Sequence, residues 1–80
     1  MTTIEQEEKR FWELAEKTGE REHCRIDLQI DGFSKDSYIA MAFGNNGYYK
    51  PPADGVGKTI TEALKSLNDN LETWLNTKAW

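Results

Sequence analysis

The stretch ADGVGKTITEALKSL, residues 53–67, decides the fold. Its first half ends in the letters GKT, which also close a nucleotide-binding P-loop of the form G-x-x-x-x-G-K-[ST]. The position five residues before Gly57 is Pro52, which has no backbone N–H to offer to a phosphate. The residues upstream also lack the buried strand that a P-loop follows. We therefore expect no nucleotide site and interpret these letters as the start of a helix.

The residues after Thr59 have the pattern of an amphipathic helix, which we predict over residues 60–76. Thr59 and Glu62 have the spacing of a capping box. Gly55 and Gly57 are interpreted as the turn before the helix, and Lys58 as a solvated side chain. Apolar residues recur at helical spacing at Ile60, Ala63, Leu64, Leu67, Leu71, Trp74 and Leu75, with Lys65, Asn68, Asp69 and Glu72 on the other side.

Upstream of this helix, alternating residues predict strands at 23–31 and 37–43 and a short third strand at 47–50. In the first strand the apolar face is Cys24, Ile26, Leu28 and Ile30. In the second we expect Ile39, Met41 and Phe43 on the inner face and Tyr38, Ala40 and Ala42 on the outer face. The links between strands are too short for parallel crossovers, so an antiparallel meander is expected.

The N-terminal residues predict a first helix over about residues 3–18. Thr2 with Glu5, or Thr3 with Gln6, has capping-box spacing, and Gly19 is expected to end the helix. Its apolar stripe is Ile4, Phe11, Leu14 and Ala15, with Trp12 at the edge and Glu7 and Glu8 outside. The predicted fold class is α+β: one small domain over residues 1–80, in the order α-β-β-β-α, with both helices packed on one face of the sheet.

The composition and net charge of the chain argue against several classes of function. The chain has 80 residues, a formal net charge of −4 and a single cysteine. The acidic balance argues against a general nucleic-acid binder, whose affinity comes from neutralised phosphates. One cysteine excludes an internal disulfide framework and suits a reducing compartment. No apolar run has the length of a membrane span and the N-terminus is no signal peptide, so we expect a cytoplasmic protein.

The side chains form no recognisable catalytic or metal-binding pattern. His23 and Cys24 are adjacent, so in a strand they face opposite sides and cannot act together as base and nucleophile. No Cys or His residues have zinc spacing. Asp27, Asp31 and Asp36 near the first hairpin are interpreted as turn-forming and solubilising groups in preference to a cation site. We predict a protein that is not an enzyme and has no cofactor and no metal.

Two families resemble this chain. The α-β-β-β-α order is similar to that of the double-stranded-RNA-binding domain, which opens its second helix with G-x-G-x-S-K-K-x-A-K. GVGKTITEAL matches the glycines, the hydroxyl residue at Thr59 and the alanine at Ala63. The family's phosphate-binding lysines fall here on Ile60, Thr61 and Leu64. The resemblance therefore implies the topology, while nucleic-acid binding is not expected.

The second resemblance covers residues 26–76 and is to the HicB-type antitoxins, which have a partial RNase H-like fold. SYIAMAF followed by GKTITEALKSLNDNLETWL is similar to the strand and the G-x-T-x-E-E-A-L helix of that family. The matched residues are Thr59, Glu62, Ala63, Leu64 and the pair Trp74 and Leu75. This resemblance implies a protein that neutralises a partner.

We therefore predict a small acidic, non-catalytic protein that binds and blocks or regulates a macromolecular partner. It would act as an antitoxin or a phage-type inhibitor of a host defence or nucleic-acid-handling protein does, since an acidic surface competes for a basic groove. The partner is expected to be a protein, with no membrane involved. The alternatives are a nucleic-acid-binding module with the topology of a double-stranded-RNA-binding domain, and a homodimeric structural protein.

The predicted contact surface is centred on the segment NNGYYKPP, residues 45–52. Consecutive strand residues face opposite ways, so one of Tyr48 and Tyr49 should lie on the open face or edge of the sheet. Tyr38, on the neighbouring strand, extends the patch, and Lys50 and Asp54 lie at its rim. Tyrosine is enriched at the centres of protein interfaces because it offers a large contact area.

Overall fold

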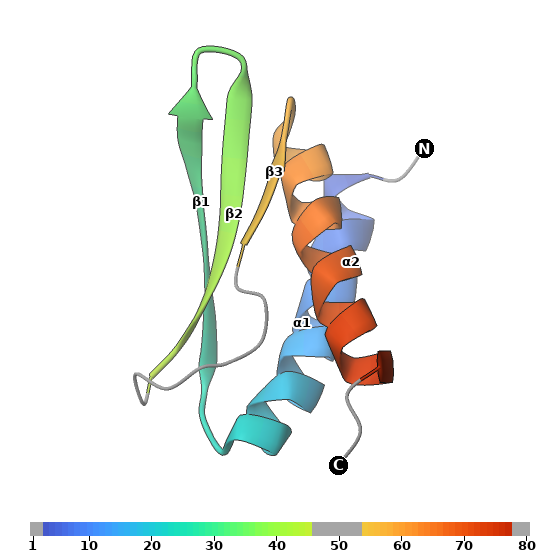
Figure 1. The fold of residues 1–80 in the computed structure, drawn as a ribbon. Coiled ribbons are helices and arrows are strands. Elements are labelled where there is room, and N and C mark those ends of the chain that lie inside the picture. The colour runs from blue at the N-terminus through green and yellow to red at the C-terminus, as the bar shows by residue number, and fades with distance from the viewer. Residues whose placement is uncertain (1–2, 46–53, 78–80) are drawn as a thin grey trace.

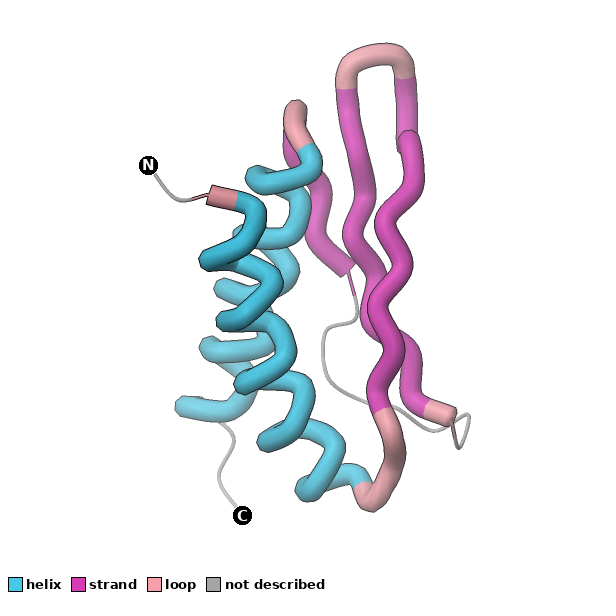
Figure 2. The backbone as a smooth tube through the Cα atoms, turned by 180° about the vertical axis from the view of Figure 1, so that it is seen from behind, coloured by secondary structure: helices cyan, strands magenta, loops and turns pink. Residues whose placement is uncertain are grey.

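The structure is a computed structural model that describes residues 3–45 and 54–77 (Figure 1). It confirms a small α+β domain in the order α-β-β-β-α. The elements are α1 (Ile4–Glu22), β1 (Ile26–Ser34), β2 (Ser37–Gly44), β3 (Asp54–Gly57) and α2 (Ile60–Thr77). The three strands form an antiparallel sheet in the order β1-β2-β3, and both helices lie on one face of it (Figure 2). Within the described residues, no helix has the length and apolar character to cross a membrane.

The first helix begins as the sequence predicts and ends later. The backbone N–H of Gln6 donates to Thr3 Oγ1 at 3.2 Å, and Gln6 Oε1 accepts the Thr3 N–H at 3.0 Å, which completes a capping box. The predicted stop at Gly19 is wrong, because α1 continues to Glu22 and ends at His23, which takes the left-handed conformation at φ 55°. Gly19 serves the chain reversal instead: a Cβ there would lie 2.7 Å from the carbonyl oxygen of Cys24.

The longer helix shifts the first strand. β1 runs from Ile26 to Ser34, three residues later at both ends than predicted, because residues 19–22 are helical. The second strand is confirmed to within one residue. The third strand predicted at 47–50 lies outside the described residues. β3 occupies Asp54–Gly57, where a turn was expected, so the interpretation of Gly55 and Gly57 as turn residues is wrong.

The two faces of β2 are the reverse of those predicted. Ala40 and Ala42 are 0% and 1% exposed and face the helices, whereas Phe43 is 46% exposed on the other side. The cause is the close approach of α2 to the sheet. A Cβ at Gly55 would meet the backbone of α2 at Ala63 and Leu67, so only glycine and alanine fit beneath the helix. The large side chains of β2 therefore point to the opposite face.

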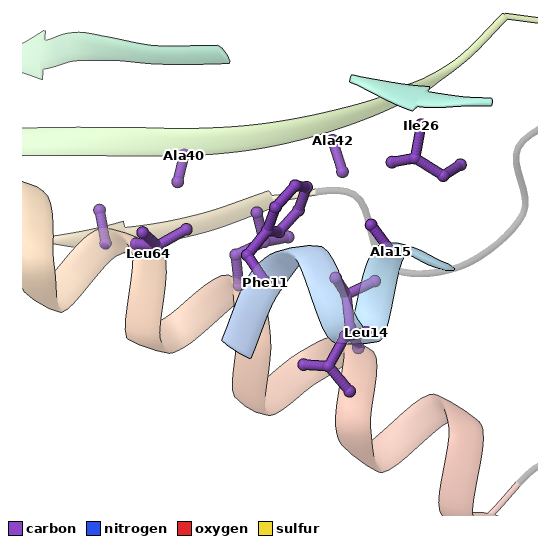
Figure 3. Packing of buried hydrophobic residues seen from close by; sticks show 10 residues of the cluster. Phe11, Leu14, Ala15, Ile26, Ala40, Ala42 and Leu64 are labelled. Carbon is purple, nitrogen blue, oxygen red and sulfur yellow. The ribbon is translucent and has the colours of Figure 1, made fainter. Parts of the chain in front are cut away.

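The core lies between the sheet and the two helices. Phe11 and Ala15 of α1 point toward Ala42 and Ile26 of the sheet in Figure 3. The buried apolar residues are Phe11, Leu14, Ala15, Ile26, Ala40, Ala42, Ala63, Leu64, Leu67 and Leu71. The burial of Leu67 and Leu71 confirms the apolar stripe predicted for α2.

Two polar residues expected at the surface are buried between the helices. Glu7 is 2% exposed and Asn68 is fully buried, contrary to the prediction for both. The Asn68 Nδ2 group donates to the Glu7 carbonyl oxygen at 2.9 Å and to Glu7 Oε1 at 3.1 Å. These two hydrogen bonds hold the helices in one register, because a shift would leave the buried Asn68 Nδ2 group unpaired.

The second helix begins at Ile60 and is capped by Thr59, as predicted, with one difference in its cap. The Glu62 N–H donates to Thr59 Oγ1 at 3.1 Å. Glu62 Oε2 accepts from the N–H of Lys58 at 3.0 Å, one residue before the expected donor. The exposed Lys58 side chain agrees with the prediction. The P-loop letters thus form the end of β3 and the cap of α2.

Candidate functional site

The face of the sheet that points away from the helices carries an apolar stripe between acidic rows. In register across the strands lie Asp31, Ile39 and Val56 in one row and Gln29, Met41 and Asp54 in the next. Asp27 lies opposite Phe43 in a third row. We call this surface the open face and define it by Asp27, Gln29, Asp31, Ile39, Met41, Phe43, Asp54 and Val56.

The centre of the open face is unusually apolar for a solvated surface. Phe43 and Val56 are each 46% exposed, and Ile39 and Met41 are half-buried. These four residues come from two adjacent strands, so they form a continuous stripe rather than scattered apolar positions. Single exposed apolar residues are ordinary on protein surfaces, whereas a contiguous stripe of this kind is a candidate contact surface.

The rim of the open face is acidic. Asp27 and Asp31 lie on the β1 side and Asp54 on the β3 side, all three exposed. The nearest cation in the alternation of β1 is Arg25, whose Nε lies 3.9 Å from Asp27 Oδ1. Both of these side chains are well exposed, so the pair neutralises little of the field. An apolar centre with a negative rim is complementary to an apolar surface with a positive rim.

The structure describes only part of the predicted contact surface. Tyr48, Tyr49 and Lys50 lie outside the described residues. Asp54 is exposed and belongs to the open face, in the same alternation as Val56. Tyr38 is 38% exposed but shares the alternation of Ala40, so the prediction that it lies on the outer face is wrong. It lies on the helix side, opposite Gly57, near the start of α2.

The sequence analysis missed the stripe because it placed Ile39, Met41 and Phe43 in the core. Both sets of alternating residues in SYIAMAF are apolar, so alternation alone does not choose between the two faces. Side-chain size is the feature of the sequence that distinguishes the inner face of β2 from the outer one. Ala40 and Ala42 share a face with Gly55 and Gly57 in neighbouring strands, and four such small residues indicate a closely packed helix.

A cleft lies between α1 and the start of β1. This cleft has a volume of about 800 Å³ and is lined on the helix side by Trp12, Glu16 and Glu20 and on the strand side by Cys24 and Ile26. Half of the Trp12 side chain is exposed, and its ring meets Phe11 edge-on at 4.9 Å between centroids.

His23 and Cys24 lie at the end of α1, beside the cleft. His23 is the cap of α1, and the N–H of Cys24 donates to the Gly19 carbonyl. Their place is a helix end rather than the strand that the sequence predicted. The part of the chain that the structure describes contains no cluster of three or more His, Cys, Asp or Glu residues that could hold a metal ion.

The strongest ionic cluster joins the two helices away from the open face. Arg10 Nη2 lies 2.8 Å from Asp69 Oδ1 and 2.9 Å from Glu72 Oε2, and Lys65 Nζ lies 3.1 Å from Asp69 Oδ2. Burial alone would raise the pKa of the Asp69 carboxyl, but the hydrogen bonds from Arg10 and Lys65 outweigh it and hold that pKa below the ordinary value. This cluster is structural, since it pairs its charges with one another.

Comparison with protein-family models, with curated proteins and with solved structures gives no match to the chain. The resemblances to the HicB-type antitoxins and to the double-stranded-RNA-binding domain therefore stay hypotheses.

Proposed function

We propose that this chain is a non-catalytic protein that binds a protein partner through the open face and blocks or regulates it. The observation that carries the proposal is the exposed stripe of Ile39, Met41, Phe43 and Val56 inside an acidic rim. Such a face fits a partner whose own surface has an apolar centre and basic borders. Surfaces of that kind occur in proteins that handle nucleic acid, where an acidic binder competes with the phosphates.

The charge of the open face favours a protein over a nucleic acid as the partner. Asp27, Asp31 and Asp54 would lie against phosphates if a nucleic acid bound there, and each such contact is repulsive. Against Lys or Arg residues of a protein, the same carboxylates speed association and orient the complex. The antitoxin resemblance of residues 26–76 is consistent with this mode of action, in which a small protein occupies the working surface of a larger one.

The size of the expected effect follows from the exposure of Phe43. Burying a whole phenylalanine side chain stabilises by about 1.5–3 kcal/mol, and nearly half of this side chain still contacts solvent. Its remaining surface is therefore worth about 1 kcal/mol on binding, so Phe43→Ala should weaken the complex about fivefold. Val56→Thr keeps the shape and the strand preference of the side chain and adds a hydroxyl to the interface, which must then be desolvated.

The experiment is affinity capture from the native host, followed by measurement of the captured partner's affinity for three variants. Phe43→Ala and Val56→Thr test the open face. Ile4→Ala is the matched control, because Ile4 is also an exposed aliphatic residue but belongs to α1, on the helix side of the molecule. We expect a basic protein partner that binds wild type and Ile4→Ala alike and binds Phe43→Ala about fivefold less tightly.

Three results would contradict the proposal. Equal affinity for all variants would remove the open face from the interaction. Recovery of nucleic acid in place of a protein would favour the nucleic-acid-binding module. A stable homodimer that Phe43→Ala dissociates would favour the structural protein.

A further inference from the structure

The free edge of β1 is the second surface that has no assigned role. In the described sheet β1 pairs with β2 alone, and it is the longest strand, at nine residues. The N–H of Asn45 donates to the Arg25 carbonyl at 3.1 Å, so the backbone groups of Arg25 point toward β2. Pairing in an antiparallel ladder alternates along the strand. The N–H and C=O groups of Ile26, Leu28 and Ile30 therefore point outward.

The opposite edge of the sheet, formed by β3, follows the same alternation and is protected from pairing with a further strand. By the same alternation the groups of Asp54 and Val56 in β3 point away from β2, and the Asp54 carbonyl accepts a hydrogen bond from Asn70 Nδ2 of α2 at 3.0 Å. β3 is also only four residues long. Shortness and cover by another element are the usual protections of an edge strand. The stretch Ile26–Ile30 belongs to a nine-residue strand and contains no proline or lysine, and within residues 3–45 and 54–77 no further strand pairs with it.

The side chains around the β1 edge indicate which residues a strand added there would carry. Under the edge lies the cleft of about 800 Å³, whose apolar wall includes Trp12 of α1, and Ile26 lines the cleft from β1. Leu28 and Ile30 follow Ile26 on the same side and are only partly buried. A strand added beside β1 would place every second side chain over these apolar groups.

The charged residues around the β1 edge indicate which side chains the added strand would carry at its other positions. Asp27 and Asp31 project from β1 on the open face, and Glu16 and Glu20 line the helix wall of the cleft. Arg25 and His23 are the basic residues of this region, at the end where β1 begins. Carboxylates thus prevail along the strand, and an added strand would be stabilised by lysine or arginine at the positions that lie beside Asp27 and Asp31.

We propose that the β1 edge binds an extended basic segment of the protein partner, which adds to the sheet as an antiparallel fourth strand. Its apolar residues enter the cleft beside Trp12, and its alternate lysine or arginine residues lie beside Asp27 and Asp31. The inference rests on the proposed function only in taking the partner to be a protein. A second copy of the chain fits less well, because it would bring the carboxylates of two acidic edges together.

The test uses a capped nine-residue peptide of alternating valine and lysine, titrated into the isotopically labelled full chain and followed by NMR. We expect the amide signals of Ile26, Leu28 and Ile30 to shift downfield and to exchange more slowly with solvent, since new hydrogen bonds form at these groups. Two methylated peptides serve as the matched pair. Opposite residues of an antiparallel pair share a face, so the valine N–H groups would face β1. N-methylation of the valines should weaken binding about tenfold, whereas N-methylation of the lysines should not.

Protein variants separate this inference from the proposed function. Trp12→Ala should weaken the peptide because it removes the wall of the cleft, whereas Phe43→Ala should leave peptide binding unchanged. If Phe43→Ala keeps the captured partner at full affinity while the β1 amides still respond to the peptide, the proposed function fails and the edge inference stands. Absence of any response at Ile26, Leu28 and Ile30, or equal binding of both methylated peptides, would overturn the inference. Sedimentation that shows self-association through β1 would overturn it in favour of a second copy.

Discussion

The contact between α2 and β3 determines which face of the sheet is open. The substitution Gly55→Ala tests this contact. A Cβ at this position would lie 2.7 Å from the Ala63 carbonyl oxygen and 2.7 Å from the Leu67 Cα, and still closer to the Leu67 amide nitrogen. All three atoms belong to the backbone of α2, which does not rotate aside as a flexible side chain does. Gly55→Ala therefore requires the whole helix to move away from the sheet.

The expected loss is at the upper end of the range for overpacked cores, about 3 kcal/mol. Urea unfolding followed by circular dichroism measures it. For an m-value of about 1.5 kcal/mol per M, the midpoint of Gly55→Ala should fall by about 2 M. Gly32→Ala is the matched control, because a Cβ at Gly32 meets no atom within 4 Å. Its midpoint should equal that of wild type or exceed it slightly, since alanine restricts the unfolded chain.

A wild-type midpoint for Gly55→Ala would contradict the close packing of α2 on β3. It would mean that α2 stands off from β3, that Ala40 and Ala42 need not be the buried residues of β2, and that the stripe of Ile39, Met41 and Phe43 need not be exposed. The functional proposal depends on that exposure, so the same unfolding experiment tests its structural basis without any partner.

Three further outcomes are expected. Leu71→Ala removes a fully buried side chain and should cost about 2–5 kcal/mol in urea unfolding, and an unchanged midpoint would place the leucine stripe of α2 in solvent. His23→Gly should stabilise the chain by about 1 kcal/mol, because the left-handed conformation at φ 55° costs glycine nothing, and a lower melting temperature would contradict this. The folded-state pKa of Asp69 lies below the value of 3.8 for the unfolded chain, so its ion pairs stabilise above pH 4, and this contribution disappears as the pH falls through the lowered pKa. Asp69→Asn should therefore be less stable than wild type at pH 7, by a difference that shrinks as the pH falls through the lowered pKa of Asp69. A difference that does not change with pH would rule the ion pairs out as its cause.

Local rules predicted the order of elements, both helix starts and the second strand, because capping residues and strong periodicity act over a few neighbours. The end of α1 was misplaced, since Gly19 is a common helix terminator and the left-handed residue is His23. Gly19 instead allows the close approach of the Cys24 carbonyl where the chain reverses, and the presence of a glycine does not by itself distinguish this use from a helix end.

The open face was missed for a related reason. Alternation defines two faces of β2, but the choice of the inner one depends on how near α2 comes to the sheet. That distance is set by Gly55 and Gly57, which were interpreted as turn residues because glycine more often serves turns than close packing. Glu7 and Asn68 were placed at the surface because neither is apolar, while their mutual hydrogen bonds, 61 residues apart in the chain, permit their burial.

The central claim is that the open face is the contact surface for a protein partner. Cross-saturation NMR tests it most directly, with the deuterated, ¹⁵N-labelled chain in complex with the captured, unlabelled partner. We expect saturation to pass to the amides of β2 and β3 around Ile39, Met41, Phe43 and Val56, with little transfer to the outer surfaces of α1 and α2. Transfer confined to the helices, with the amides of the open face unaffected, would contradict it.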